Sequence, residues 1–569
     1  MEYKQMVALS IHEALVKNDV KSLSKQEITK TLEVPPQQSM GDYAFPCFVL
    51  AKTLKKAPNQ IANDLSANME SGLIERVEAV GPYVNVYLDK TFTGKAIVEE
   101  ILNEREAYGS PSLGNGEQIT IDLSSPNIAK PFSMGHLRST VIGNALANIM
   151  QKCGYTPVKI NHLGDWGTQF GKLITAYKQW GEEEKVKAEP IKELLALYIH
   201  FHEEAEVNPE LEVQGRYWFK QLEDGNQEAL ALWKWFREVS LVDFQRIYQL
   251  LGVEFDSFQG EAFYNDKMEP VVNELEEKHL LSESDGAMVV GLDEFNHPPC
   301  LIKKSDGATL YATRDLAAAL YRKKEYSFAK ALYVVGGEQS LHFKQVFEVL
   351  KKMGYTWAAD MHHISFGMML KDGKKMSTRK GKIVLLEEVL KEAIELATEN
   401  IESRNHELEN KEEVAKSVGV GAVIFHDLKN YRQNDIEFSL ESMLTFEGET
   451  GPYIQYTYAR ACSILRKGMN QVEIVEQSYQ AFQDDKAWTV LSLLMKFEEV
   501  ITHAYHQFDP SQIAKYTIDL AQAFNKYYAT VRILEEDNQL GSRLQLVEAT
   551  TIVLKEGLRL LGLKAPEKM

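Results

Sequence analysis

Residues 124–140 read Ser-Ser-Pro-Asn-Ile-Ala-Lys-Pro-Phe-Ser-Met-Gly-His-Leu-Arg-Ser-Thr, and they join a strand-like run to a helix-like run. Apolar residues alternate over 119–123 before this stretch and recur at helical spacing over 141–150 after it. A helix that starts directly after a strand presents free N–H groups and the positive end of its dipole to an anion. Gly135 lets a nucleotide approach the backbone, and His136 supplies a hydrogen-bond donor. The stretch predicts a phosphate-binding turn, although a Gly-His step alone is more often an ordinary turn between a strand and a helix.

The pattern around this turn indicates a parallel sheet. From residue 118 onward, helical stretches separate a series of strand-like runs, which are 119–123, 158–161, 331–335 and 363–366. This order is typical of an α/β doubly wound domain, which binds ligands at the carboxyl ends of its strands. A charged, Glu-rich helical segment over 178–251 interrupts the pattern, and we interpret it as an insertion.

Regions of different composition flank the sheet. Short helix-like and strand-like runs fill residues 1–112 and end in a polar loop, which predicts an α+β N-terminal domain. After residue 382 the strand pattern stops and long helix-like runs continue to the end, which predicts an all-α bundle. We therefore expect three domains, which are 1–112, 113–440 with the insertion at 178–251, and 441–569.

Length and composition are those of a soluble, multi-domain protein. The chain has 569 residues, of which 44% are hydrophobic and 25% charged, and this length suggests about two to four domains. No apolar run is long enough to span a membrane, so we expect a cytoplasmic protein without membrane contact. The cysteines lie far apart and without metal-binding spacing, at Cys47, Cys153, Cys300 and Cys462. We expect reduced thiols, no zinc and no other metal held by the protein alone.

A second loop adds positive charge to a chain whose net charge is −19. Residues 373–381 read Gly-Lys-Lys-Met-Ser-Thr-Arg-Lys-Gly. Most charge runs of this kind are solvated surface loops. Because the chain as a whole is acidic, we expect any nucleic-acid contact to use local basic patches such as this one.

A third pattern is suited to a cationic amino acid. Tyr311 and Asp315 are four residues apart and share one helix face. A guanidinium group needs a carboxylate that accepts two parallel hydrogen bonds, which an ammonium group does not reproduce. On spacing alone, a surface charge is the commoner explanation for Asp315.

Together these motifs resemble one family. Residues 124–140 resemble the ATP-binding loop of class I aminoacyl-tRNA synthetases, and their first eight residues resemble the arginyl branch. The "HIGH" tetrapeptide of that class begins with histidine, whereas this chain has Ser133. Residues 373–381 resemble its "KMSKS" loop, with Thr378 in place of the second lysine. In enzymes of this branch that lack that lysine, a lysine upstream of the Gly-His step replaces it, and Lys130 holds that position.

The resemblance implies a role for each matching residue. The catalytic group comprises Lys130, His136, Lys375, Ser377 and Lys380. The implied ATP-binding residues are Ser133, Gly135, His136, Gly367, Met368 and Met376. The implied arginine-binding residues are Asp122, Ser124, Asn127, Tyr311, Asp315 and Gln339. A further family segment, 161–171, adds the candidate polar contacts His162, Asp165 and Gln169.

The same resemblance indicates where tRNA binds. The C-terminal helices are similar to the anticodon-binding domain of the arginyl, cysteinyl and valyl enzymes, and Asn85 matches a position that contacts the D-loop of tRNA. The candidate contacts are Asn85, Tyr453, Tyr456, Arg460 and Met569. Aromatic faces stack on splayed bases, but tyrosines at helical spacing are more commonly part of a core.

The expected activity is ATP-dependent attachment of L-arginine to its tRNA through arginyl-adenylate, with Mg²⁺ accompanying ATP. We expect a monomer that activates arginine only when tRNA is bound. Two alternatives stay open, a non-catalytic relative that binds tRNA or senses arginine, and another class I synthetase such as the cysteinyl enzyme. The cluster His200, His202, Glu203 and Glu204 resembles a metal site in composition, but on an amphipathic helix it is better explained as a solvated face.

Overall fold

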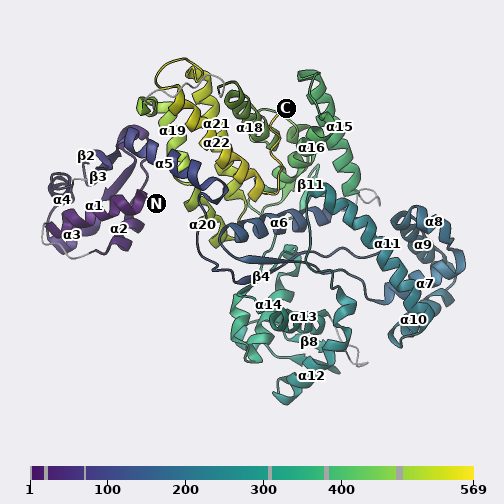
Figure 1. The fold of residues 1–569 in the computed structure, drawn as a ribbon. Coiled ribbons are helices and arrows are strands. Elements are labelled where there is room, and N and C mark those ends of the chain that lie inside the picture. The colour runs from purple at the N-terminus through teal and green to yellow at the C-terminus, as the bar shows by residue number, and fades with distance from the viewer. Residues whose placement is uncertain (1–2, 18–22, 70–71, 305–310, 377–383, 469–477) are drawn as a thin grey trace. The chain divides into compact units, whose positions relative to one another are not determined.

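The structure is a computed structural model that describes residues 3–17, 23–69, 72–304, 311–376, 384–468 and 478–569. The chain forms two compact units (Figure 1). One comprises Met1–Tyr108, Arg460–Phe497 and Asp519–Val553, and the other comprises Gly109–Ala459, Glu498–Ile518 and Leu554–Met569. Among the described residues, no helix combines the length and the apolar character that crossing a membrane requires.

The first unit contains a small antiparallel sheet. Its strands lie in the order β1 (Tyr43–Pro46), β3 (Tyr83–Leu88) and β2 (Ile74–Val80). The N-terminal helices of this unit are α1 (Tyr3–Lys17), α2 (Lys25–Thr31), α3 (Phe48–Leu54), α4 (Pro58–Ser66) and α5 (Lys90–Glu104). Asp89 begins α5, because its side chain accepts the N–H of Phe92 at 2.8 Å. The mixture of helices and strands agrees with the α+β region that the sequence predicts.

The second unit is built on a parallel four-stranded sheet, as expected. The strand order is β10 (Met361–His363), β9 (Lys330–Tyr333), β4 (Gln118–Ser124) and β5 (Thr156–Asn161), and every neighbouring pair is parallel. From β4 the chain crosses to β5 on one side and later returns to β9 on the other. A switch point of this kind leaves an opening at the carboxyl ends of the central strands, which is where ligands bind in such sheets.

The observed strands differ in detail from the predicted runs. The strands β9 and β10 end two and three residues before the predicted runs 331–335 and 363–366 end. Beyond the ends of β9 and β10, the two segments still form an isolated parallel bridge between Gly336 and Phe366. A two-residue strand, β13 (Ile436–Glu437), also pairs in parallel with β11 (Met369–Lys371), although the sequence predicts no strand after 382. Two residues are too short a segment to produce a recognisable alternation.

Helices and two small sheets surround the parallel sheet (Figure 1). The segment after β5 forms α7 (Thr168–Trp180), α8 (Glu183–Ala188), α9 (Pro190–Val207), α10 (Glu210–Glu223) and α11 (Gln227–Leu251). It is followed by α12 (Met268–Glu277) and the antiparallel strands β6 (Leu281–Ser284), β7 (Ala287–Val290) and β8 (Cys300–Lys303). The flanking helices α6 (Leu137–Lys152), α13 (Tyr311–Tyr326) and α14 (Ser340–Lys352) complete the α/β part, and β12 (Lys374–Lys375) pairs with β11.

The C-terminal part of the chain is helical, as expected. Its helices are α15 (Leu386–Arg404), α16 (Lys411–Leu428), α17 (Leu440–Met443), α18 (Gly451–Gly468), α19 (Asp485–Leu494), α20 (Phe497–Gln507), α21 (Ser511–Thr530) and α22 (Leu540–Leu560). The division between the compact units passes through α18, α21 and α22.

Close packing of α6 on β4 fixes the turn between them. A Cβ atom added to Gly143 in α6 would lie 2.2 Å from Cβ of Leu123 in β4, far inside van der Waals contact. Leu123 is itself fully buried. Only glycine lets the helix approach the strand this closely, and the approach sets the position of the helix N-terminus.

We expect Gly143→Ala to destabilise the protein by about 1–3 kcal/mol, because the helix must move away from Leu123. The control is Gly291→Ala, where an added Cβ would meet only Oδ2 of Asp293, at 3.7 Å. Urea denaturation followed by circular dichroism measures both. Equal midpoints for the two variants would contradict the importance of this contact.

Candidate active site

Two adjoining cavities open at the carboxyl ends of β4 and β9. The first encloses about 380 Å³ and the second about 310 Å³. Both are lined by Ser125, which follows β4, and by Val335 and Gln339, which follow β9. The strand order therefore produces two compartments with one shared wall.

The Gly-His turn lines the second cavity. Met134–His136 form a single turn of 3-10 helix that leads directly into α6. The backbone N–H of Ser133 donates to Nδ1 of His136 at 3.1 Å, so Nδ1 is the acceptor and the neutral ring carries its proton on Nε2. Burial lowers the pKa of His136 to about 4. His136 therefore offers an uncharged N–H donor to this cavity.

Most of the predicted ATP-binding residues come together around the second cavity. Gly135, His136, Gly367, Met368 and Met376 all line it. Ser133 does not line it, because its hydroxyl lies 3.2 Å from Nδ1 of His136 and holds that ring. The sequence prediction did not include Arg138 and Glu338, which also line the cavity.

Arg138 ties this cavity to the helical part of the same unit. Its side chain is 1% exposed, and its Nε donates to Oδ2 of Asp427 in α16 at 3.0 Å. Its other nitrogens donate to the carbonyl oxygens of Arg432 and Asn434. These bonds satisfy a buried charge at the start of α6.

Backbone pairing joins the Gly-His turn to the end of the basic loop. The N–H of Met134 donates to the carbonyl oxygen of Val384 at 3.1 Å, and the N–H of Leu386 donates to that of Phe132 at 3.0 Å. On the other side of the loop, Met376 donates its N–H to Met369 in β11. Both flanks of the loop are thereby fixed beside the second cavity.

The structure describes only part of the predicted catalytic group beyond His136. Ser377 and Lys380 lie outside the described residues, and Lys375 is described only as part of the backbone of β12. The ammonium group of Lys130 lies 5.5 Å from the ring centroid of Tyr198 in α9, and Lys130 lines neither cavity. Lys130 therefore makes a cation–π contact rather than a contact with the second cavity.

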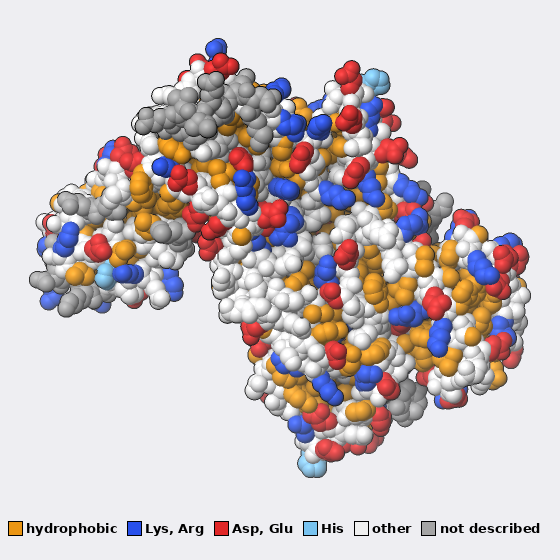
Figure 2. All heavy atoms as spheres, viewed as in Figure 1, with side chains coloured by type: hydrophobic (Ala, Val, Ile, Leu, Met, Phe, Trp, Pro, Cys, Tyr) orange, Lys and Arg blue, Asp and Glu red, His pale blue; other side chains and the backbone are white. Residues whose placement is uncertain are grey.

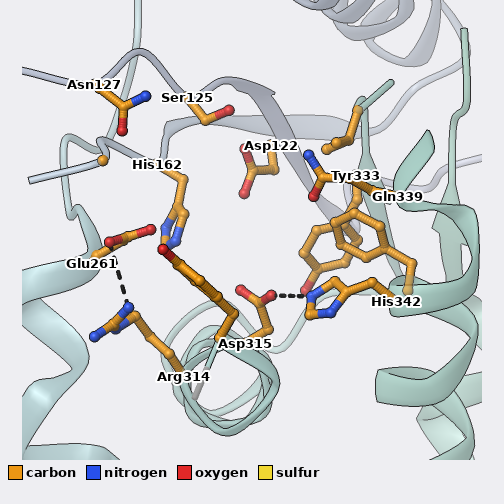
Figure 3. Close-up of a pocket in the computed structure, with 14 residues that line it drawn as sticks. Asp122, Ser125, Asn127, His162, Glu261, Arg314, Asp315, Tyr333, Gln339 and His342 are labelled. Atoms are coloured by element: carbon orange, nitrogen blue, oxygen red, sulfur yellow. Dashed lines mark hydrogen bonds and ion pairs between the residues drawn. The ribbon is translucent and has the colours of Figure 1, made fainter. Parts of the chain in front are cut away.

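The first cavity is lined by three carboxylates from three separate elements (Figure 3). They are Asp122 in β4, Glu261 in the 3-10 segment Glu261–Lys267, and Asp315 in α13. Each has one protein partner. Nη2 of Arg322 lies 3.0 Å from Asp122, Nη1 of Arg314 lies 3.4 Å from Glu261, and Nε2 of His342 lies 2.5 Å from Asp315.

The surroundings shift the pKa values of Asp315 and Glu261 in opposite directions. Burial alone would raise the pKa of Asp315, but the hydrogen bond from His342 and the charges near it lower that pKa below its ordinary value. Burial raises the pKa of Glu261 to about 7, against the opposing charge of Arg314 and with the support of Asp315. The cavity therefore holds ionised oxygen acceptors suited to a cationic ligand, and one of them gains charge near neutral pH.

Five predicted arginine-binding residues line this first cavity, and one does not. The five are Asp122, Asn127, Tyr311, Asp315 and Gln339. Ser124 is 2% exposed and its hydroxyl lies 2.8 Å from that of Tyr248. The pairing of β4 with β5 shifts register between Asp122 and Ser124, so the alternation breaks there and Ser125 faces the cavities instead.

Some lining residues were not predicted for this pocket. Glu261, Arg314 and His342 line the cavity, and so does His162, which the sequence suggested only as a polar contact. Asp165 holds the segment that carries Glu261, because it accepts the N–H of Ala262 at 2.8 Å and a hydrogen bond from Arg237. Glu261 follows a glycine in an irregular segment, where hydrophobic periodicity carries no signal.

The predicted tRNA contacts are dispersed. Asn85 lies in β3 and is 3% exposed, while Tyr453, Tyr456 and Arg460 are half-buried on α18. The carbonyl oxygen of Met569 accepts a hydrogen bond from Asn405 at 3.2 Å. Figure 2 shows basic and acidic side chains interspersed over the visible face. These five residues stay predictions.

We expect His136 to stay neutral down to about pH 5. Because burial lowers its pKa to about 4, the unfolded chain takes up the proton first, and this residue costs stability as pH falls from about 6.5 toward 4. NMR titration of histidine-labelled protein measures the pKa, with His136→Gln to assign the signal. Titration of His136 near pH 6.5 would contradict the burial of its ring.

Comparison with known proteins identifies the family. Models of three domains match, described as "tRNA synthetases class I (R), catalytic domain" over 97–440, "Arginyl tRNA synthetase N terminal domain" over 2–88 and "DALR anticodon binding domain" over 454–569. Arginine–tRNA ligase 2 of Bacillus anthracis is 60% identical and the arginine–tRNA ligase of Exiguobacterium sibiricum 59% identical, each over 100% of both chains. The solved Thermus thermophilus arginyl-tRNA synthetase superposes with a TM-score of 0.81 at 26% identity, covering 100% of each chain. The chain belongs to the arginyl-tRNA synthetase family of class I aminoacyl-tRNA synthetases.

Proposed function

We propose that this arginine–tRNA ligase forms arginyl-adenylate from arginine and ATP, and that it does so only with tRNA bound. Membership of the family supports the overall activity, the attachment of arginine to tRNA. The observation that carries the proposal is the pair of cavities that share Ser125, Val335 and Gln339. One cavity has the acidic lining that a guanidinium needs, and the other has the helix N-terminus that phosphates need.

In the first step, the substrates meet at the shared wall. The arginine side chain lies among Asp122, Glu261 and Asp315, which leaves its α-carboxylate toward Ser125 and Gln339. A carboxylate oxygen attacks the α-phosphorus of ATP, the bond to the bridging oxygen breaks, and pyrophosphate leaves with the electron pair. The protein supplies position and charge neutralisation rather than a nucleophile.

On the ATP side, the neutral His136 donates from Nε2, and the helix N-terminus adds backbone N–H groups. Glu338 lines the same cavity and would offer an oxygen ligand to the Mg²⁺ that accompanies ATP, which would add positive charge beside the phosphates. The lysines of the basic loop and Lys130 neutralise the negative charge of the departing pyrophosphate. The reaction takes place in the cytoplasm.

In the second step, a hydroxyl of the terminal adenosine of tRNA attacks the carbonyl carbon of arginyl-adenylate. AMP leaves as the ester forms.

Lys130 links tRNA binding to the first step. Its ammonium group lies against Tyr198 of α9, and it must leave that ring to reach a phosphate group. We propose that binding of tRNA to the unit that carries α9 releases the ammonium group of Lys130 from Tyr198.

The decisive experiment is tRNA charging with radiolabelled arginine, lysine and cysteine in parallel. We expect only the arginine product. Asp315→Ala removes an ionised acceptor from the cavity and should raise KM for arginine about 100-fold while KM for ATP changes little. The matched control is Glu325→Ala, an exposed carboxylate on the same helix.

The outcomes separate the alternatives. Charging with cysteine or lysine would replace the proposed substrate, and tRNA binding without any charging would support a non-catalytic relative. If Asp315→Ala and Glu325→Ala behave alike, the first cavity is not the arginine site.

Exchange of pyrophosphate into ATP tests the order of events. Without tRNA we expect no exchange, and with tRNA we expect exchange that Lys130→Ala reduces about 100-fold, because a cation near the phosphates is lost. Ser133→Ala should cost less, since the backbone N–H of Ser133 still holds His136. Full exchange in the absence of tRNA would overturn the proposed requirement.

A further inference from the structure

A fixed guanidinium group lies beneath the cavity that is proposed to receive a guanidinium. Arg322, in the last turns of α13, is 2% exposed. Its Nη2 donates to Oδ2 of Asp122 at 3.0 Å and lies 3.2 Å from Nδ1 of His162. The ring of Tyr333 covers it, with 5.6 Å between the ring centroid and Cζ. A buried cation next to a cation-binding pocket is costly and therefore needs a specific role.

The contact with Arg322 occupies one oxygen of Asp122 and leaves the other oxygen for the substrate. Oδ2 is held by Arg322, while Asp122 lines the first cavity. A carboxylate accepts hydrogen bonds through both oxygens. The second oxygen of Asp122 can therefore accept from a ligand while Arg322 still balances the charge of the carboxylate.

The contact with His162 fixes the tautomer of that ring. A guanidinium only donates, so Nδ1 of His162 is the acceptor and a neutral ring carries its proton on Nε2. His162 also lines the cavity. A neutral ring there adds no positive charge to a pocket that is proposed to receive a guanidinium.

We propose that Arg322 is a positioning residue for arginine, which holds Asp122 as an oriented acceptor and His162 as a neutral ring on one wall of the cavity. The two terminal hydrogens of Nη2 lie in a fixed plane and serve both neighbours at once. An ammonium group at this place keeps the charge but not the planar geometry. The inference rests on the proposed arginine cavity.

Substitutions can separate the charge of Arg322 from its geometry, because the charge acts on the pKa of His162. Burial lowers the pKa of His162, Asp122 raises it and Arg322 lowers it further. The other charged groups that act on the ring are Asp315 and Asp165, and the ring of Tyr264 packs against it at 5.6 Å. Removal of the Arg322 charge therefore raises the pKa of His162, and its protonation places a cation where arginine must bind.

The test compares Arg322→Lys and Arg322→Gln by aminoacylation with the full chain and tRNA. Both variants should raise KM for arginine about tenfold or more, with KM for ATP unchanged and kcat less affected. Toward lower pH, KM for arginine should rise more steeply in Arg322→Gln than in the unaltered chain, whose own pH dependence includes Glu261. Arg322→Lys, which retains the charge, should restore the original pH profile.

The matched control is Arg543→Lys. Arg543 is another buried arginine, 5% exposed and 2.8 Å from Asp537, and it lines neither cavity. The Arg543→Lys substitution should leave KM for arginine unchanged at every pH. Circular dichroism melting verifies that each variant is folded, and if Arg322→Gln does not fold, the KM of Arg322→Lys decides alone.

A folded Arg322 variant with an unchanged KM for arginine would overturn the inference. If Asp315→Ala weakens arginine use and the Arg322 variants do not, only the role of Arg322 fails. If Asp315→Ala also has no effect, the arginine cavity itself is wrongly assigned.

Discussion

The parallel pairing of β4 with β5 on one side and with β9 on the other is the constraint on which the site depends. The chain passes from β4 to β5 on one side and later returns to β9 on the other, so the carboxyl ends of β4 and β9 form a switch point, where the two cavities open. The close approach of Gly143 to Leu123 places the helix N-terminus at that opening, and backbone bonds from Met134 and Phe132 tie it to the residues after the basic loop.

Electrostatic design differs between the two compartments. In the first, each of three acids lies beside a hydrogen-bonding partner, Arg322, Arg314 or His342, so the pocket is acidic without containing an isolated buried carboxylate. In the second, His136 is neutral, and Lys130 lines neither cavity. For the proposed reaction, the lysines of the basic loop and Lys130 are the cations expected to neutralise the pyrophosphate that leaves ATP.

Sequence reasoning predicted the parts of the site that depend on local pattern. The sheet and the Gly-His turn follow from periodicity and spacing. The six predicted arginine contacts come from the family resemblance instead, and five of them line the first cavity. Ser124 does not line it, because the register shifts at the end of β4, and this shift is a property of the pairing and not of the strand itself.

Other features depend on contacts between distant segments. Glu261 comes from an irregular segment held by Asp165, and the orientation of Lys130 depends on Tyr198, whose sequence position gives no hint of the contact. Arg322 is a helical residue like many others until the fold brings it under Asp122. Such roles arise from tertiary packing and have no local signature.

The pairing of β4 with β9 also constrains how the protein is made. Ile119 pairs with Lys330, so about 200 residues must be synthesised before this side of β4 has a partner. At about 5–20 residues per second, β4 and β5 wait roughly 10–40 s with one hydrogen-bonding edge uncovered. Residues 168–251, which fold into helices through local contacts, emerge during that interval. The long crossover that creates the catalytic opening therefore makes the nascent chain most vulnerable to wrong strand pairing midway through its synthesis.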